Sequence, residues 1–250
     1  MAYLILLAAV VMLGLLGYVA HKVRRIHMAT YHVLEEAIAA RREAAALFDQ
    51  LHALASLEKL LAMPQCLPPM RNWAGSPDML LHLAQLLLKS RPRCVAECSS
   101  GVSTVVAARC MQLNGQGHVY SLEHDETYAA KTRELLARYD LTNWASVVIA
   151  PLEPVAGGPG WYARDALPQE MPPIDVLVVD GPPAGGASTA RYPALGQLAS
   201  RMPGEVTVLL DDADRPGEQA VVEQWLKEHP GLRLERLQAE KGLAKLIGTL

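Results

Sequence analysis

Hydrophobic side chains follow three different patterns along the 250-residue chain. Residues 2–20 are apolar throughout and contain no charged side chain. Residues 30–63 contain no Gly or Pro and are rich in Ala, Leu and Glu, and from residue 93 onward short apolar runs alternate with amphipathic segments. The first pattern predicts a membrane helix, the second a long amphipathic helix, and the third a domain of alternating strands and helices.

The apolar run Ala2–Ala20 has the length of a membrane span, because a helix of this size extends about 28 Å and a bilayer core is about 30 Å thick. A secretory signal peptide is the alternative, but no Lys or Arg precedes the run, and Tyr18 and Ala20 make a poor cleavage site. A basic flank follows, consisting of His21, Lys22, Arg24, Arg25 and His27. The positive-inside rule therefore predicts a single-pass anchor in the cytoplasmic (inner) membrane, with the rest of the chain in the cytoplasm.

The segment 21–63 is predicted to be a helical stalk. Leucines recur at steps of three or four, at Leu47, Leu51, Leu54, Leu57 and Leu61, and give the helix one apolar stripe. This stripe is compatible with a coiled coil that makes a homodimer and equally with a helix packed on its own domain. Prolines then end the helix, so the expected organisation is an anchor over 1–20, a stalk over 21–63 and a globular domain over 64–250.

The globular domain is predicted to be α/β, with a doubly wound and mostly parallel sheet. Strands are expected at 94–97, 119–123, 146–150, 174–180 and 206–211, and helices between them include 103–113 and 126–139. The last two strands, 232–238 and 243–248, are separated by only four residues. A connection this short cannot cross over between parallel strands, so this pair is expected to form a C-terminal antiparallel hairpin.

Charge and cysteine content narrow the class of protein. The chain has 23 basic and 26 acidic side chains and is 51% hydrophobic. This balance excludes a disordered tail protein and a strongly basic nucleic-acid binder. The four cysteines show no metal-binding spacing and are interpreted as reduced, buried thiols.

Two features predict a nucleoside-type ligand at the carboxyl edge of the sheet. The first strand runs into a turn of small residues, where the backbone can approach a ligand and a helix start offers free N–H groups. The residues of this turn expected at the ligand are Ser99, Ser100, Gly101 and Ser103. The second strand ends in Glu123, about 20 residues later, where such sheets place an acid that binds ribose hydroxyls.

From about residue 73 to 250 the sequence resembles class I S-adenosylmethionine-dependent methyltransferases, in particular a bacterial membrane-anchored branch. Glu97 to Gly101 is similar to the family's acid-x-Gly-x-Gly motif, and the stretches 121–125, 178–183 and 209–215 look like its later motifs. The resemblance implies a Rossmann-like fold and a cofactor, S-adenosylmethionine, held by Glu97, Gly101 and Glu123. Ser99 replaces the first glycine of the motif; if φ is positive there, a non-glycine residue costs about 1–2 kcal/mol, equivalent to about tenfold in affinity.

Three acids end neighbouring strands on the same edge: Asp180 after one, and Asp211 and Asp212 after the next. This arrangement resembles metal-dependent O-methyltransferases of the catechol type, which implies Mg²⁺ or another divalent cation that lowers the pKa of a substrate hydroxyl. The alternative is structural, with Asp180 holding the following turn and Asp212 beginning a helix. A metal-free reaction would use Asp180 or His124 as general base.

Each of the other side chains expected on this edge has two possible roles. Residues 180–195 are a candidate substrate lid. Arg191 and Arg215 either bind an anionic acceptor or pair with nearby aspartates. The aromatic residues Trp73, Trp161 and Tyr162 either form a wall for the substrate or pack in the core.

The function that best unites these features is a membrane-anchored methyltransferase that acts on an oxygen of a small or lipid-linked acceptor at the cytoplasmic face. The alternative is a scaffold that keeps the fold and has lost catalysis, with its stalk recruiting partners. A nicotinamide dehydrogenase is disfavoured, because Thr104 stands at the third glycine of Gly-x-Gly-x-x-Gly and because of the terminal hairpin.

Overall fold

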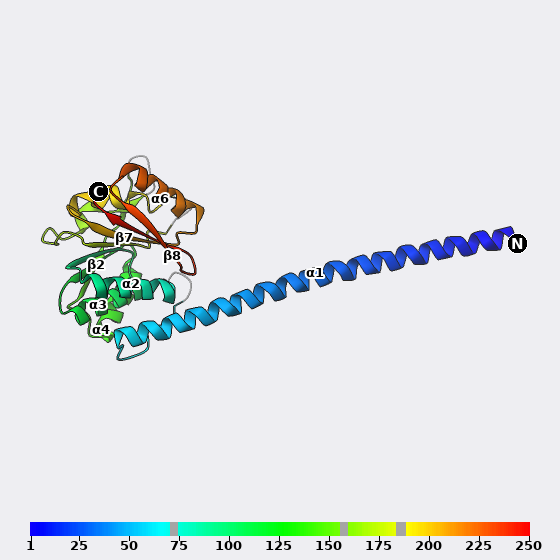
Figure 1. Ribbon diagram of the computed structural model, residues 1–250, viewed down its shortest axis with the longest axis horizontal. Helices are drawn as coiled ribbons and strands as arrows, with labels where there is room; N and C mark the ends of the chain where they lie inside the picture. Colours follow the sequence, from blue (N-terminus) through cyan, green and yellow to red (C-terminus); the bar gives the residue numbers. More distant parts are fainter. Residues whose placement is uncertain (71–74, 156–159, 184–188) are drawn as a thin grey trace. The chain divides into compact units, whose positions relative to one another are not determined.

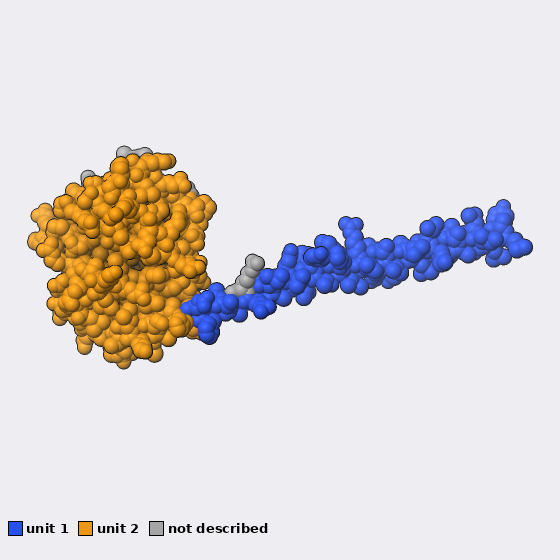
Figure 2. Space-filling model, in the orientation of Figure 1, with its two compact units in different colours: residues 1–49 blue, residues 50–250 orange. Residues whose placement is uncertain are grey.

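The computed structural model spans the chain and describes all residues except 71–74, 156–159 and 184–188, together with every side chain outside those segments but 42, 43 and 164. It contains two compact units, Met1–Asp49 and Gln50–Leu250 (Figure 2).

One helix, α1 (Ala2–Leu61), begins in the first unit and ends in the second (Figure 1). The anchor and the stalk were expected as separate helical segments; they are continuous because the intervening residues contain neither Gly nor Pro. Every described side chain of the first unit is exposed. The helix is long and apolar enough to cross a membrane, and none of its most apolar stretch is buried.

The last turns of α1 belong to the core of the second unit. Leu57 and Leu61 are fully buried and share a hydrophobic cluster with α2 (Pro77–Ser90). Leu51, on the same predicted stripe, is exposed. For Leu57 and Leu61, therefore, the apolar stripe is explained by packing on the helix's own domain.

Asp78 joins three segments of the second unit. Its carboxylate accepts hydrogen bonds from Gln50 Nε2 of α1 at 2.8 Å, from the Ser76 hydroxyl at 2.5 Å, from the Met79 amide at 2.8 Å and from the Glu240 amide at 2.7 Å. Partial burial acts to raise the pKa of Asp78, but these hydrogen bonds outweigh it and lower the pKa below its ordinary value. Asp78 thus links the end of α1, the start of α2 and the C-terminal turn.

A seven-stranded sheet forms the centre of the domain, in the order β3-β2-β1-β6-β7-β9-β8. Its strands are β1 (Cys94–Cys98), β2 (His118–Glu123), β3 (Ala145–Ile149), β6 (Val176–Val179), β7 (Val206–Asp211), β8 (Arg233–Leu237) and β9 (Leu243–Gly248). The first five in this list are parallel, and β9 is antiparallel to both β7 and β8. The predicted parallel sheet with a C-terminal hairpin is confirmed.

Helices cover both faces of the sheet. Helices α2, α3 (Val102–Asn114) and α4 (Glu126–Arg138) pack on one face, and α5 (Pro193–Leu198) and α6 (Pro216–Glu228) pack on the other. Alternation along β1 divides its side chains between the two faces, with Val95 in one cluster and Ala96 in the other. Short 3₁₀ turns occupy η1 (Arg164–Ala166) and η2 (Ala199–Arg201).

A small antiparallel sheet, β4 (Leu152–Glu153) with β5 (Trp161–Tyr162), was not predicted. Strands of two residues are too short to show a periodic pattern in the sequence. The pair matters for the site because Trp161 and Tyr162 are both buried in the hydrophobic cluster on the face of the sheet that carries α5 and α6.

The starts of α2 and α4 are capped by polar residues, whereas Asp212 caps no helix. Ser76 is the N-cap of α2 with Pro77 at its first position, and Asp125 caps α4 by accepting hydrogen bonds from the Thr127 and Tyr128 amides. Asp212 does not begin a helix, since α6 starts at Pro216. Asp212 instead has a left-handed backbone with φ +58°, a conformation that aspartate tolerates better than most residues.

All four cysteines are free. Cys94, Cys98 and Cys110 are buried, as expected, and burial raises the pKa of Cys94 and of Cys110 to about 12. Cys66 is exposed, contrary to the expectation, because it lies in the proline-rich connection between α1 and α2.

Candidate functional site

The strand register brings the predicted site residues to one edge. Cys98, the last residue of β1, is paired with Leu122 of β2 on one side and with Val179 of β6 on the other. Val179 is in turn opposite Leu210 of β7. The residues that directly follow these positions are Ser99, Glu123, Asp180 and Asp211, and parallel strands place them along a single rim.

The turn after β1 is built around Ser99 and Gly101. Ser99 has φ +113°, and its amide donates to the Leu122 carbonyl at 3.0 Å. Ser99 therefore has the positive φ that its place at a motif glycine raised as a possibility, and this φ costs a non-glycine residue on the order of 1–2 kcal/mol. Gly101 is the N-cap of α3, and its amide donates to the Thr104 hydroxyl at 3.0 Å.

Glu97 supports the turn after β1 through hydrogen bonds. The side chain is 1% exposed, and its Oε2 accepts hydrogen bonds from the Thr104 hydroxyl at 2.6 Å and the Ser121 hydroxyl at 2.5 Å. Among the described residues Oε1 has no partner. Burial raises the pKa of Glu97, and the hydrogen bonds to it offset this only in part. Glu97 thus shapes the turn through Thr104, which is itself bonded to Gly101.

Glu123 connects the turn to the end of β2. Its Oε2 accepts a hydrogen bond from the Ser100 hydroxyl at 2.9 Å, and its Oε1 accepts one from the Asp125 amide at 3.0 Å. His124 Nδ1 lies 3.1 Å from Oε1, close enough for electrostatic attraction but without hydrogen-bond geometry. A carboxylate can accept about four hydrogen bonds, so Glu123 keeps capacity for further donors.

A cavity of about 300 Å³ opens between these elements. It is lined by residues 99–103 of the turn, by Glu123 and His124, and by Tyr162 and Asp180. Of the residues predicted to hold a cofactor, Ser99, Ser100, Gly101, Ser103 and Glu123 line this cavity, and Glu97 is not among the described residues that do. The volume is at the lower end of the range for small-molecule sites.

Tyr162 separates this cavity from a second one of about 290 Å³, because it lines both. Its hydroxyl is buried and has no hydrogen-bond partner among the described residues. A Cβ at Gly181 would lie 2.6 Å from that hydroxyl, so Gly181 permits the close approach of the ring. Of the predicted aromatic wall, Tyr162 reaches the first cavity, while Trp73 lies outside the described residues, as do residues 184–188 of the predicted lid.

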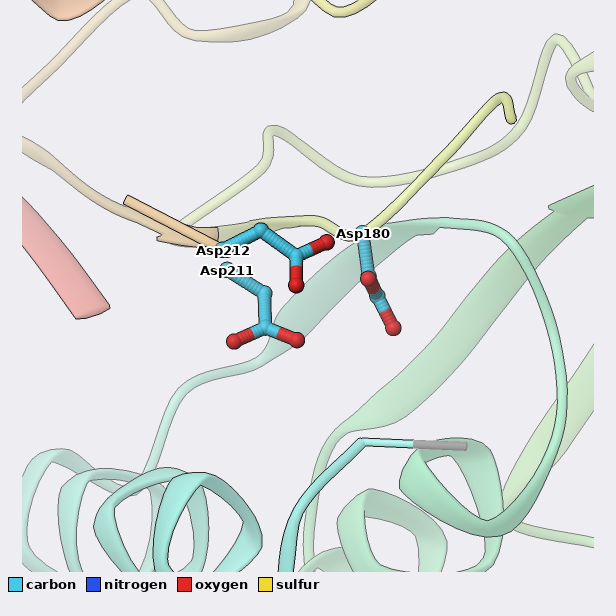
Figure 3. Close-up of side chains that lie close together, drawn as sticks. All are labelled: Asp180, Asp211 and Asp212. Carbon is cyan, nitrogen blue, oxygen red and sulfur yellow. The ribbon is translucent and has the colours of Figure 1, made fainter. Parts of the chain in front are cut away.

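The three aspartates that follow β6 and β7 form a cluster (Figure 3). One carboxylate oxygen from each of Asp180, Asp211 and Asp212 lies within 4.8 Å of the others. Asp211 and Asp212 are 1% and 3% exposed. Asp180 lines the 300 Å³ cavity, whereas Asp211 and Asp212 are not among the described residues that do.

Arg191 is inserted into this cluster. Its Nη2 donates to Asp212 Oδ2 at 2.8 Å and to Asp180 Oδ1 at 3.2 Å, and its Nη1 donates to the Asp211 carbonyl at 2.8 Å. Arg215 also pairs with Asp212, at 2.9 Å. Of the two interpretations of Arg191 and Arg215, binding of an anionic acceptor or pairing with aspartates, the structure therefore has the second. Burial and the nearby Asp211 raise the pKa of Asp180 well above its ordinary value even so.

The sequence offered pairing with a nearby aspartate as one of two interpretations of Arg191, but it did not single out Asp180 and Asp212 as the partners. Arg191 follows Asp180 by 11 residues and precedes Asp211 by 20. It lies in an irregular segment with no periodic signal. Buried arginines are uncommon unless paired, and the aspartates at the strand ends supply the partners of Arg191.

Comparison with known proteins supports a methyltransferase class for the globular unit. Residues 98–213 match a family described as a methyltransferase domain. No curated protein matches the chain. Among solved structures, the cofactor-bound protein Rv0187 from MTB is similar, with 22% identity, a TM-score of 0.55, and coverage of 82% of this chain and 89% of that one.

Two further solved structures have the same fold. An O-methyltransferase from Bacillus cereus in complex with SAH has 20% identity and a TM-score of 0.54, with coverage of 79% of this chain and 91% of the other. TomG from Streptomyces achromogenes, an O-methyltransferase of tomaymycin synthesis in complex with SAM, has 15% identity, a TM-score of 0.53, and coverage of 80% and 89%. The family match over residues 98–213 and the shared fold support a class I S-adenosylmethionine-dependent methyltransferase domain in the globular unit.

Proposed function

We propose that this protein binds S-adenosylmethionine in the 300 Å³ cavity and transfers its methyl group to a hydroxyl oxygen of a small or lipid-linked acceptor at the cytoplasmic face of a membrane. The observation that carries the proposal is that the turn at residues 99–103 and the carboxylate of Glu123 line one cavity. A nucleoside in that cavity has both groups within reach.

The residues present fit the cofactor. Glu123 has free acceptor capacity for ribose hydroxyls. The first N–H groups of α3 have no partner inside the helix and suit a carboxylate. A Cβ added at Gly101 would meet nothing within 4 Å, so the backbone there borders open space that a ligand can occupy. The unpartnered Tyr162 hydroxyl supplies a further polar contact at the cavity wall.

Bound S-adenosylmethionine supplies an electrophilic methyl group. The remaining requirement for O-methylation is removal of the proton from the acceptor hydroxyl, and two groups that line the cavity, Asp180 and His124, are suited to accept it. His124 is partly exposed and is held beside Glu123. Transfer to oxygen is further supported by the similar proteins from B. cereus and S. achromogenes, which are O-methyltransferases by name.

The membrane location is proposed from α1. Residues 2–20 form the anchor, and the basic flank at residues 21–27 faces the cytoplasm by the positive-inside rule. An acceptor that is itself part of the bilayer surface would be concentrated near such an anchored enzyme. The exposed apolar side chains along residues 21–49 also support a homodimer through the stalk.

Cofactor binding is tested by titration calorimetry on the full-length protein in detergent. Wild type is expected to bind S-adenosylmethionine and S-adenosylhomocysteine. Glu123→Gln is expected to weaken binding by about 10- to 150-fold, because hydrogen bonds to a charged acceptor contribute about 1.5–3 kcal/mol. Glu126→Gln, an exposed acid three residues further along, serves as the matched control and should bind as wild type does.

The two negative outcomes have different meanings. If wild type gives no heat with either ligand at about 1 mM, a concentration that detects even very weak binding, the cofactor proposal is wrong and the inactive scaffold is favoured. If Glu123→Gln binds as tightly as wild type, the cofactor lies elsewhere than in this cavity.

The acceptor is tested with methyl-labelled cofactor offered to membrane lipid extracts and, separately, to soluble metabolite extracts. Label is expected on a hydroxyl oxygen of a compound in one of these extracts, and enrichment in the lipid fraction favours the lipid-linked class. Label found only on nitrogen or carbon would contradict O-methylation while leaving cofactor binding intact.

A further inference from the structure

The acid cluster at the ends of β6 and β7 contains its own cation. A guanidinium carries a permanent positive charge and five N–H donors, and it cannot be deprotonated in a protein. Arg191 directs these donors to the Asp180 and Asp212 carboxylates and to the main-chain carbonyls of Asp180 and Asp211, at 2.8 to 3.2 Å. Glu218 Oε1 also lies near this group, 3.7 Å from Nη1 of Arg191. The Arg191 side chain is 7% exposed, so it is a buried structural cation.

The cluster does not fit the divalent ion that the sequence pattern suggested. Such an ion needs several oxygen ligands, which for Mg²⁺ are usually one or two carboxylates and several waters. Nη2 of Arg191 already bridges Asp180 Oδ1 and Asp212 Oδ2, the two carboxylates an ion would have to share. A dication added beside the guanidinium would be repelled by it, and the buried cluster leaves only Asp180 at the cavity.

The unpartnered oxygens point to the same conclusion. Asp211 Oδ1 and Asp212 Oδ1 are buried without hydrogen-bond partners among the described residues. They are two oxygens from adjacent residues on β7 and the turn after it, and neither residue is among those described as lining the cavity. An ion held by these two oxygens alone would not reach an acceptor hydroxyl, so it could not perform the activation that a catalytic metal provides.

We infer that Arg191 takes the place of a divalent cation in this protein, so that methyl transfer is independent of metal and Arg191 holds Asp180 at the edge of the cavity. This inference rests on the proposed function. Arg191 is a positioning residue, since it acts through Asp180. By bonding to the carbonyls of Asp180 and Asp211 it also fixes the ends of β6 and β7 relative to each other.

The first experiment uses the wild-type full-length chain in detergent and needs no variant. Metal-free protein is titrated with Mg²⁺, Mn²⁺ and Ca²⁺ while heat and Tm are recorded, and turnover is measured with and without a chelator. Neither specific heat, nor a rise in Tm, nor loss of turnover in chelator is expected. Saturable binding of any of these ions with stabilisation, or turnover that a chelator abolishes and Mg²⁺ restores, would overturn the inference.

The second experiment removes the internal cation. Arg191→Met keeps an unbranched stem and leaves the acids without their guanidinium, so an added divalent ion can bind them. The Tm of this variant is expected to rise with Mg²⁺ or Ca²⁺ concentration, as for any ligand that binds only the folded state. Arg215→Met, which removes a half-exposed arginine from the same Asp212, is the control and should show no such rise.

The remaining outcomes are separable. A folded Arg191→Met that stays insensitive to the ions would contradict the claim that Arg191 excludes them. If Arg191→Met does not fold, Arg191→Lys keeps a charge without the planar fork, and turnover is expected to fall while S-adenosylmethionine affinity is retained. Cofactor titration on the same samples keeps the two proposals apart, since absent cofactor binding refutes the proposed function, whereas cofactor binding with metal-dependent turnover refutes only this inference.

Discussion

Two groups of acids lie on the same edge of the sheet, and their side chains have different kinds of partner. Glu97 and Glu123 receive hydrogen bonds from hydroxyl groups and from a backbone amide, and a cavity opens beside them. Asp180 and Asp212 receive a buried guanidinium from Arg191. Neutral donors leave Glu123 able to accept a ligand's hydroxyls, whereas the guanidinium of Arg191 occupies Asp180 and Asp212. The role of an acid at a strand end therefore depends on its hydrogen-bond and ion-pair partners.

Removing the fixed charge should have the largest effect on this contrast. Arg191→Met is expected to lower the free energy of unfolding by about 3–5 kcal/mol, because it leaves buried carboxylates without their partner. Arg215→Met should cost about 0–1 kcal/mol, because a half-exposed ion pair contributes little. Denaturant unfolding of the second unit, followed by tryptophan fluorescence, measures both. Equal effects for the two variants would show that Arg191 has no special place in the cluster.

Removing a neutral donor should have a smaller effect on the other group. Thr104→Val deletes the hydroxyl that donates to Glu97 and accepts from the Gly101 amide. A loss of about 1–3 kcal/mol in unfolding free energy is expected, because a buried acceptor loses its donor. The exposed Thr142→Val is the control. Unchanged stability of Thr104→Val in the same unfolding assay would mean that water replaces the hydroxyl, and that the turn does not depend on Thr104.

The smallest effect is expected at Ser99. Ser99→Gly relieves about 1–2 kcal/mol of backbone strain but adds about 0.5–1 kcal/mol of conformational entropy to the unfolded chain. The net result should be a rise of no more than about 1.5 kcal/mol in unfolding free energy, read from the denaturation midpoint at constant slope. A clear decrease would show that the Ser99 side chain, and not its φ of +113°, dominates at this position.

Most of the fold could be predicted from the sequence, because the fold depends on local patterns of apolar residues and on the lengths of connections. Apolar runs marked the parallel strands, and a four-residue connection required the antiparallel hairpin β8–β9. The distance from the first turn to Glu123 located the edge of the cavity. The site was less accessible, since the position of Arg191 depends on long-range packing, and the burial of Glu97 beneath the turn depends on hydroxyls from two elements. Neither leaves a periodic trace.

The buried end of α1 limits where the chain can be shortened. Leu57 and Leu61 each contribute about 1.5–3 kcal/mol by burial, and Gln50 donates to Asp78. A truncation that starts after Leu61 would therefore remove part of the core along with the membrane-like segment, and the resulting fragment should aggregate. A fragment that begins shortly before Gln50 would keep those side chains, so residue 50, rather than the prolines at 64–69, is the practical limit for preparing the globular unit without the apolar N-terminal segment.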